Sequence, residues 1–326
     1  MAENSAISWT THTWNPVIGC TKVSPACDGC YAEAMMDKRY HRVQWGKPGQ
    51  QGTLSRTSDS TWNDPHRWQR QAEKDGTRPF VFCASLADVF DNQWDPQWRA
   101  EAFEVMRDTP NLVYLLLTKR PQNIVKMVKQ IGFMPDNIAF GSTVEDRERV
   151  TKNLPHLIVA AALRPLFLFA SCEPLLGDLG DLSPWMTGDP YPQRLADGER
   201  YKNGIKIGAD GWAKLPAIGW WITGGETDQG GHKARPTHPD WFRSIRDQAL
   251  HHGLAYHHKQ NGEWVPWIPR NGNPDGKPIQ HVMQDGSEYH PGNYGSSLQS
   301  MIKVGKKLSG RCLDGVEHDA FPEVAA

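Results

Sequence analysis

The sequence predicts an α/β protein built as a partial TIM-like barrel of six or seven βα units. Short apolar runs recur along the chain without alternating polar residues, which is typical of parallel strands buried on both faces. Most of these runs are followed by a segment with helical spacing or helix-start residues. With 326 residues, 38% of them hydrophobic, the chain is long enough to bury such a core.

The first unit is expected to begin with a strand over residues 14–19, which leads into a loop rich in cysteine. A helix follows over residues 31–40, where apolar residues recur on neighbouring turns. Residues 44–76 are polar and show no sheet pattern. We expect a loop there, with one short helix near residues 65–71.

The later strands are recognised by apolar runs that end in polar residues. Asp95 and Pro96 form a helix start, Pro121 opens another helix, and a third helix is expected to stop before Pro155. The last helix, residues 239–252, would be capped by Gly253. The six strands are expected at residues 80–85, 112–117, 138–143, 166–171, 218–223 and 254–258.

Two stretches interrupt this pattern. Residues 178–215 are rich in Gly, Asp, Pro and Tyr, and form either an insertion over the barrel mouth or an excursion to its outside. Residues 261–326 are irregular and are expected to pack as an extension on a barrel formed by residues 1–260. The basic run around Lys306 and Lys307 could contact phosphate, although a solvated surface run is the simpler interpretation.

Composition limits the partners and the location. The formal net charge is −1, so the chain has no global basic field, and a nucleic-acid contact would need a local patch. No apolar run is long enough to span a bilayer, and residues 1–5 lack the features of a signal peptide. We therefore expect a cytoplasmic protein with no membrane partner and with reduced thiols.

Polar residues follow the predicted strands at corresponding points. The carboxyl ends of parallel barrel strands meet on one face, where such folds build their active sites. The sequence therefore predicts a ligand-binding mouth on that face. The polar residues that would gather there are Ser85, Asp88, Lys119, Arg120, Ser142, Glu145, Glu173 and Glu226.

Three cysteines, Cys20, Cys27 and Cys30, stand in a C-x6-C-x2-C loop directly after the first predicted strand. A structural zinc site is closed by four protein ligands, whereas three thiolates leave one position open, as an iron-sulfur cluster that binds a substrate requires. Two alternatives remain at this point. A disulfide would leave one odd thiol, and zinc could take His12 or another cysteine as its fourth ligand.

These motifs together resemble a phage and prophage protein family of unassigned function, which is itself similar to radical S-adenosylmethionine enzymes. Spore photoproduct lyase is the nearest relative of known chemistry. The resemblance covers nearly the whole chain, and the first cysteine gap departs from the usual C-x3-C-x2-C loop. The motifs that carry it are the cysteine loop, residues 117–121, 141–145, 172–177 and 224–226, and the terminal residues 305–315.

The resemblance implies a barrel of the radical S-adenosylmethionine type with a [4Fe-4S] cluster on Cys20, Cys27 and Cys30. The fourth iron would chelate S-adenosyl-L-methionine, and one electron, from a flavodoxin- or ferredoxin-like reducing system, would generate a 5'-deoxyadenosyl radical that abstracts hydrogen from the substrate. The substrate would be a nucleobase or nucleotide, free or in DNA. The alternative from another class is a non-catalytic, zinc-stabilised binding protein.

The resemblance also assigns individual residues. Tyr31 would close over the cluster, Lys119 would bind the methionine carboxylate, and Ser85 and Ser142 would contact the cofactor. Cys83 could donate hydrogen to the product radical, although a cysteine in an apolar strand is usually a small buried side chain. The residues expected to contact ribose, adenine or substrate are Glu145, Glu173, Gly224, Gly225 and Glu226.

Overall fold

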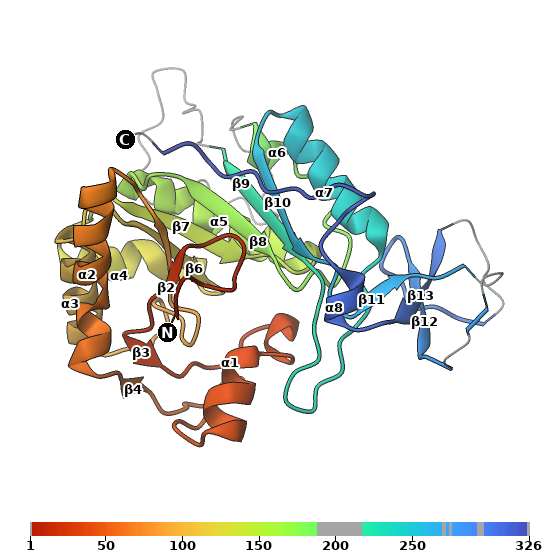
Figure 1. Cartoon of the computed structure of the whole chain (residues 1–326), viewed down its shortest axis with the longest axis horizontal. Helices are drawn as coiled ribbons and strands as arrows, with labels where there is room; N and C mark the ends of the chain where they lie inside the picture. Colours follow the sequence, from red (N-terminus) through yellow and green to blue (C-terminus); the bar gives the residue numbers. More distant parts are fainter. Residues whose placement is uncertain (1, 188–216, 269–271, 274–275, 292–296, 325–326) are drawn as a thin grey trace, which may run out of the picture.

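The computed structural model describes residues 2–187, 217–268, 272–273, 276–291 and 297–324. They form a mixed α/β fold around a curled sheet that makes a half-barrel (Figure 1). Seven neighbouring strands are parallel, and β1 adds an antiparallel edge to β2. In spatial order the strands are β1 (Ala2–Glu3), β2 (His12–Thr13), β5 (Phe80–Cys83), β6 (Val113–Thr118), β7 (Ile138–Thr143), β8 (Leu168–Cys172), β9 (Trp220–Gly224) and β10 (Ala255–Gln260).

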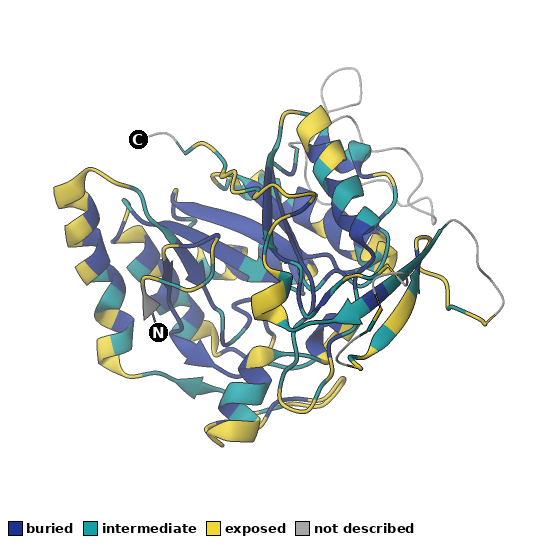
Figure 2. Cartoon of the chain, turned by 45° about the vertical axis from the view of Figure 1, so that its right-hand side comes forward, coloured by how far each residue is buried: buried dark blue, intermediate teal, exposed yellow. Residues whose placement is uncertain are grey.

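Helices cover the outer face of the curl, and strands β6 to β9 are buried along almost their whole length (Figure 2). The predicted start at Asp95 is confirmed, because its side chain accepts a hydrogen bond from the Gln97 backbone. Pro121 opens a short 3-10 turn that leads into α4. The long helices are α2 (Asp59–Asp75), α3 (Pro96–Arg107), α4 (Ile124–Ile131), α5 (Arg147–Val159) and α7 (Pro239–His251).

Successive strand residues face two separate apolar clusters, as the absence of alternation predicts. The larger cluster lies between the sheet and the helices and includes Tyr114, Phe140 and Trp221. The smaller cluster fills the inside of the curl and includes Trp9, Phe82, Leu115, Phe169 and Trp220.

The first strand does not lie where the sequence predicts it. The sheet strand is β2, just before residue 14, and residues Val17–Ile18 form β3, which pairs with β4 (Ser55–Arg56) in a separate two-stranded ribbon. The expectation was wrong because the apolar run around Val17 packs in the outer core without joining the barrel sheet. The cysteine loop therefore begins on this ribbon, beside the carboxyl edge of the sheet.

Two helices continue through a proline where the sequence predicts a loop or a stop. Helix α2 spans 17 residues and contains Pro65, which cannot donate a hydrogen bond to the Thr61 carbonyl. The indole of Trp14 donates to that carbonyl instead, at 3.0 Å. Helix α5 likewise continues past Pro155, and the carbonyl left without a helical donor belongs to the exposed residue Thr151.

The predicted interruption at residues 178–215 is described only up to residue 187. That part contains α6 (Ser183–Met186), and the Leu182 amide donates to Gln248 of α7, so it lies against the helix layer. Leu182 and Trp185 are buried in the outer core. The rest of the predicted insertion lies outside the described residues.

The C-terminal region forms a small sheet and then returns to the half-barrel (Figure 1). Its strands β11 (Trp264–Pro266), β12 (Ile279–Met283) and β13 (Leu298–Lys303) are antiparallel, and α8 (Lys306–Ser309) follows. The last residues then cover the free edge of β10, where the His258 amide donates to the His318 carbonyl at 2.9 Å. Among the described residues, none of the helices combines the length and the apolar character needed to cross a membrane.

Candidate functional site

A cavity of about 620 Å³ opens at the carboxyl ends of the sheet strands, as the sequence predicts for a ligand-binding mouth. It is lined by the cysteine loop on one side and by strand-end residues on the other. Its inner wall is apolar and includes Trp9, Phe82 and Leu117. The predicted site residues that line it are Cys20, Cys27, Cys30, Tyr31, Ser85, Lys119, Glu173, Gly225 and Glu226.

The three cysteines of the loop are free thiols. Cys20 follows β3, Cys27 ends a 3-10 turn (Pro25–Cys27), and Cys30 caps α1 (Tyr31–Glu33), which continues as a π-helical segment, Ala34–Arg39. The described part of the chain holds no group of three His, Cys, Asp or Glu side chains arranged to bind one metal ion. A cluster sets a different requirement, because each thiolate then binds a different iron.

Arg120 attaches the cysteine loop to the sheet. Its side chain is 6% exposed, and its guanidinium lies 2.9 Å from both Asp88 and Asp91 and donates to the Thr21 carbonyl at 2.7 Å. The same group lies 3.6 Å from the Cys20 sulfur. Burial and the two aspartates raise the pKa of the Cys20 thiol, whereas Arg120 lowers it.

A second arginine holds the loop from the opposite side. Arg235 donates to the Pro25 carbonyl at 3.0 Å and lies 3.5 Å from Asp28. Glu226 orients it by accepting from its backbone amide and its Nε, each at 2.8 Å. Burial raises the pKa of Glu226, but the hydrogen bonds from Arg235 outweigh it, so the pKa lies below the ordinary value. Glu226 therefore positions the loop, and it also lines the cavity, where its contact with a ligand stays a prediction.

Lys119 is a second cation of the cavity that lies near the thiols. Burial lowers its pKa, but Cys27, Glu145 and the other two cysteines raise it by more, so the lysine stays charged. Its backbone amide donates to Asp88, which fixes the position of the residue. Within the described residues the ammonium makes no hydrogen bond or ion pair, so it is free to bind an anionic group.

Ser85 and Tyr31 lie together, as predicted, and a third residue joins them. The Tyr31 hydroxyl donates to Ser85 Oγ at 3.2 Å, and the Asn15 amide donates to the same oxygen at 3.0 Å. Asn15 also accepts from the Leu86 amide at 2.7 Å, which fixes the turn after β5. Asn15 follows the carboxyl end of β2, and it was missed from the sequence because residues 14–19 were expected inside the first strand.

Glu173 is expected to contact a ligand, and the structure pairs it with Lys259 at 2.5 Å and Gln260 at 3.3 Å. Beside it, a side chain at Gly225 would bring its Cβ within 2.2 Å of the Asn261 carbonyl. The glycine therefore allows β9 and β10 to approach closely at the cavity edge. Gly224 does not line the cavity, and its Cβ position lies 3.1 Å from Glu173.

Two predicted site residues face the helix layer and do not line the cavity. Ser142 is completely buried, and its hydroxyl donates to the Thr143 carbonyl at 3.3 Å, so Thr143 is the residue that presents its side chain to the cavity. Cys83 is also completely buried, within the outer core, while its neighbour Phe82 faces inward. A shift of one residue along a strand reverses the face. The position of Cys83 favours a packing role over hydrogen donation.

Glu145 is buried at the end of β7 and does not line the cavity directly. Neither carboxylate oxygen has a hydrogen-bond partner among the described residues, and Arg149 Nε is the nearby cation at 3.6 Å. The expected contact to ribose or adenine therefore has no geometric support, although the charge acts on Lys119.

The positions of His12 and His232 test whether a histidine could be the fourth ligand of a zinc site. His12 stacks on Trp68, with ring centroids 4.4 Å apart, and does not line the cavity, so it is not placed as a fourth ligand. His232 lies beside Gly29 of the loop, and its Nε2 is 3.2 Å from a Glu226 oxygen. Three thiols in one cavity, with an open side, thus fit a group that needs three protein ligands.

The family that matches this sequence is described as "Protein of unknown function (DUF5131)", and the match covers residues 4–322. The chain belongs to this family. No curated protein and no solved structure matches the sequence. The family description names no activity.

Proposed function

We propose that this protein is a radical S-adenosylmethionine enzyme whose [4Fe-4S] cluster is held by Cys20, Cys27 and Cys30. The observation that carries the proposal is the placement of three free thiols and an unpaired Lys119 in one cavity at the carboxyl edge of a half-barrel. The resemblance of the motif order to that enzyme class supports it. When bound, the cluster and its cofactor supply the reducing and hydrogen-abstracting chemistry.

The side chains of the cavity would bind and orient the cofactor. Lys119 offers a charged donor to the carboxylate of S-adenosylmethionine, and the hydroxyls of Ser85 and Thr143 offer hydrogen bonds to its polar groups. Tyr31 lies at the mouth, held by Ser85, where it can cover the bound group. The apolar inner wall excludes water, which protects reactive species from side reactions.

We propose a nucleobase or nucleotide as the substrate. Trp9 and Phe82 pack against each other on the inner wall, with ring centroids 4.7 Å apart, and together give the cavity an aromatic wall against which a flat ring compound can pack. Modified nucleosides in the DNA of cells with the wild-type gene, absent with a Cys27→Ala gene, would identify the product.

The enzyme class is tested by anaerobic reconstitution. The wild type should bind iron and sulfide, appear brown, and slowly cleave S-adenosylmethionine to 5'-deoxyadenosine when reduced with dithionite. Cys20→Ala, Cys27→Ala or Cys30→Ala should abolish iron binding, whereas His12→Ala and His232→Ala should retain it. If the purified wild type contains zinc, and the His12→Ala or His232→Ala variant loses it, the protein is the alternative zinc-stabilised binding protein. A reconstituted cluster with no cofactor cleavage would overturn the proposed activity.

A further inference from the structure

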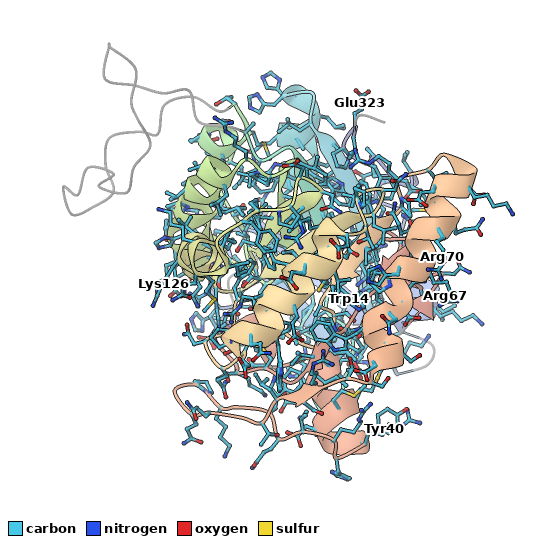
Figure 3. The ribbon with its side chains drawn as sticks, turned by 90° about the vertical axis from the view of Figure 1, so that its left-hand side faces the viewer. Trp14, Tyr40, Arg67, Arg70, Lys126 and Glu323 are labelled. Carbon is cyan, nitrogen blue, oxygen red and sulfur yellow. The ribbon has the colours of Figure 1, made fainter. Side chains whose placement is uncertain are left out.

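The segment that follows the cysteine loop is strongly basic. Residues 38–58 contain five Lys and Arg residues and no Asp or Glu, although the whole chain has 36 basic and 37 acidic residues. Five exposed residues of this segment form what we call the basic surface: Lys38, Arg39, Tyr40, Arg42 and Lys47. Figure 3 shows Tyr40 at the lower edge of the molecule, below Arg67 and Arg70 of helix α2.

The segment that carries the basic surface is hydrogen-bonded directly to the backbone of the cysteine loop. The Gly46 amide donates to the Cys20 carbonyl at 3.0 Å, and the Lys22 amide donates to the Gly46 carbonyl at 3.0 Å. Underneath, Trp45 is buried in a small apolar cluster against which Cys20 and Cys30 pack. This segment therefore separates the loop thiols from solvent on that side.

The cations of this surface have few partners within the protein. Arg42 and Lys47 make no ion pair with any described residue, and the one ring contact of Arg39 is with its neighbour Tyr40, at 5.3 Å. Lys38 lies 3.5 Å from the mostly buried Glu33. By contrast, Arg243 and Arg246 on α7 are both paired with Asp314. Unpaired exposed cations beside an exposed aromatic ring are available to an acidic partner.

The surface lies on the side of the loop that faces away from the cavity. Met35, Met36 and Trp45 line the cavity, whereas none of the cations of the basic surface does. A substrate must reach the cavity, so a nucleic-acid substrate would gain little from contacts on the outer side. An electron donor, by contrast, does not have to enter the cavity and needs only to bind close to the thiols. Redox partners commonly form small and transient interfaces.

We propose that the basic surface docks an acidic electron-transfer protein, such as a flavodoxin or ferredoxin, beside the cysteine loop. The inference rests on the proposed function, because the acceptor is the cluster held by the three thiols. One electron passes: the partner is oxidised by one electron and the bound cluster is reduced by one. Opposite charges on the two surfaces accelerate their association, and salt screens this effect.

The test is a charge-reversal variant, Arg39→Glu with Arg42→Glu and Lys47→Glu. Its matched control reverses three exposed cations on the helix layer: Arg70→Glu, Lys74→Glu and Lys129→Glu. Both variants change the net charge equally, so a local effect separates from a global one. Binding of an acidic flavodoxin to metal-free and reconstituted protein is measured by calorimetry, and cluster reduction is followed by stopped-flow absorbance.

We expect the basic-surface variant to lose at least about 10-fold in flavodoxin affinity and in reduction rate at low salt. The control variant should keep both, and the wild-type rate should fall as salt rises. Cofactor cleavage driven by dithionite should be equal in all three proteins, which shows that each is intact. Absence of that cleavage in the wild type would refute the proposed enzyme, whereas the binding measurement on metal-free protein would still test the docking surface.

Equal losses in both variants would overturn the inference, as would a basic-surface variant that is reduced at the wild-type rate. Lost affinity for single- or double-stranded DNA with unchanged reduction by flavodoxin would also overturn it, because the surface would then bind nucleic acid. No binding of the wild type to flavodoxin or ferredoxin at low salt would likewise count against the proposal.

Discussion

Replacing Arg120 with Met should strongly destabilise the protein and release the cysteine loop. The side chains of Arg120, Asp88 and Asp91 are 6%, 9% and 3% exposed, so removing the guanidinium leaves two carboxylates buried without their cation. Breaking a buried ion pair in this way costs about 3–5 kcal/mol of unfolding free energy. The lost hydrogen bond to the Thr21 carbonyl adds to this effect.

Urea unfolding of the metal-free protein, followed by circular dichroism, measures this loss. Arg147→Met is the matched control, because Arg147 pairs with Asp178 but its side chain is 67% exposed. An exposed pair contributes at most about 1 kcal/mol. Adding Asp91→Asn to Arg120→Met should recover part of the stability, whereas Asp91→Asn alone should reduce it.

A loss from Arg120→Met no larger than that from Arg147→Met would refute the argument that a buried charge network holds the loop. Equal effects of Asp91→Asn in both backgrounds would refute it as well, since the second change is beneficial only where the carboxylate lacks its partner.

Three further changes test other parts of the site. Lys119→Met should weaken S-adenosylmethionine binding at least about 10-fold, measured by equilibrium dialysis, without lowering the melting temperature. Cys83→Ala should cost about 1 kcal/mol in urea unfolding and leave any product unchanged, because its thiol is buried in the outer core; an altered product would restore the donor role. Burial raises the pKa of Asp228, but Lys303 and the Ala234 amide lower it to about 2, so its stabilisation is present above pH 4 and is lost as the pH falls towards 2. Asp228→Asn should therefore cost about 0.5–1 kcal/mol at pH 7 and almost nothing at pH 2, and a constant difference across this range would exclude the ion pair as its cause.

The parallel sheet could be predicted because strands buried on both faces leave long apolar runs in the sequence. The sequence predictions were wrong where the deciding contact comes from another part of the chain. Nothing near Pro65 shows that the indole of Trp14 replaces the missing helical donor, so the sequence suggested a loop. The first strand was misplaced because the Val17 run is buried in the outer core, and burial alone does not say which sheet a run joins.

The site was predictable as a group of strand ends and less so as individual side chains. Spacing identifies where a strand ends, but a shift of one residue decides whether Ser142 or Thr143 faces the cavity. Arg235 could not be found from strand ends, since it lies on a loop and contacts the cysteine loop directly, oriented by Glu226. The sequence feature that could have indicated Arg235 is its positive charge, which is complementary to the acidic residues Asp28 in the cysteine loop and Glu226 at the strand end.

The two arginines explain how a loop with a long first gap can still present three thiols in a defined place. Six residues separate Cys20 from Cys27, so the loop alone has too many conformations to fix their distance. Arg120 anchors the chain just after Cys20, and Arg235 anchors it just before Cys27, each from a different part of the half-barrel. The separation of these two thiols is therefore set by the barrel, and the hydrogen bonds of the two arginines to the loop carbonyls offset part of the entropy of ordering the loop before any ligand binds.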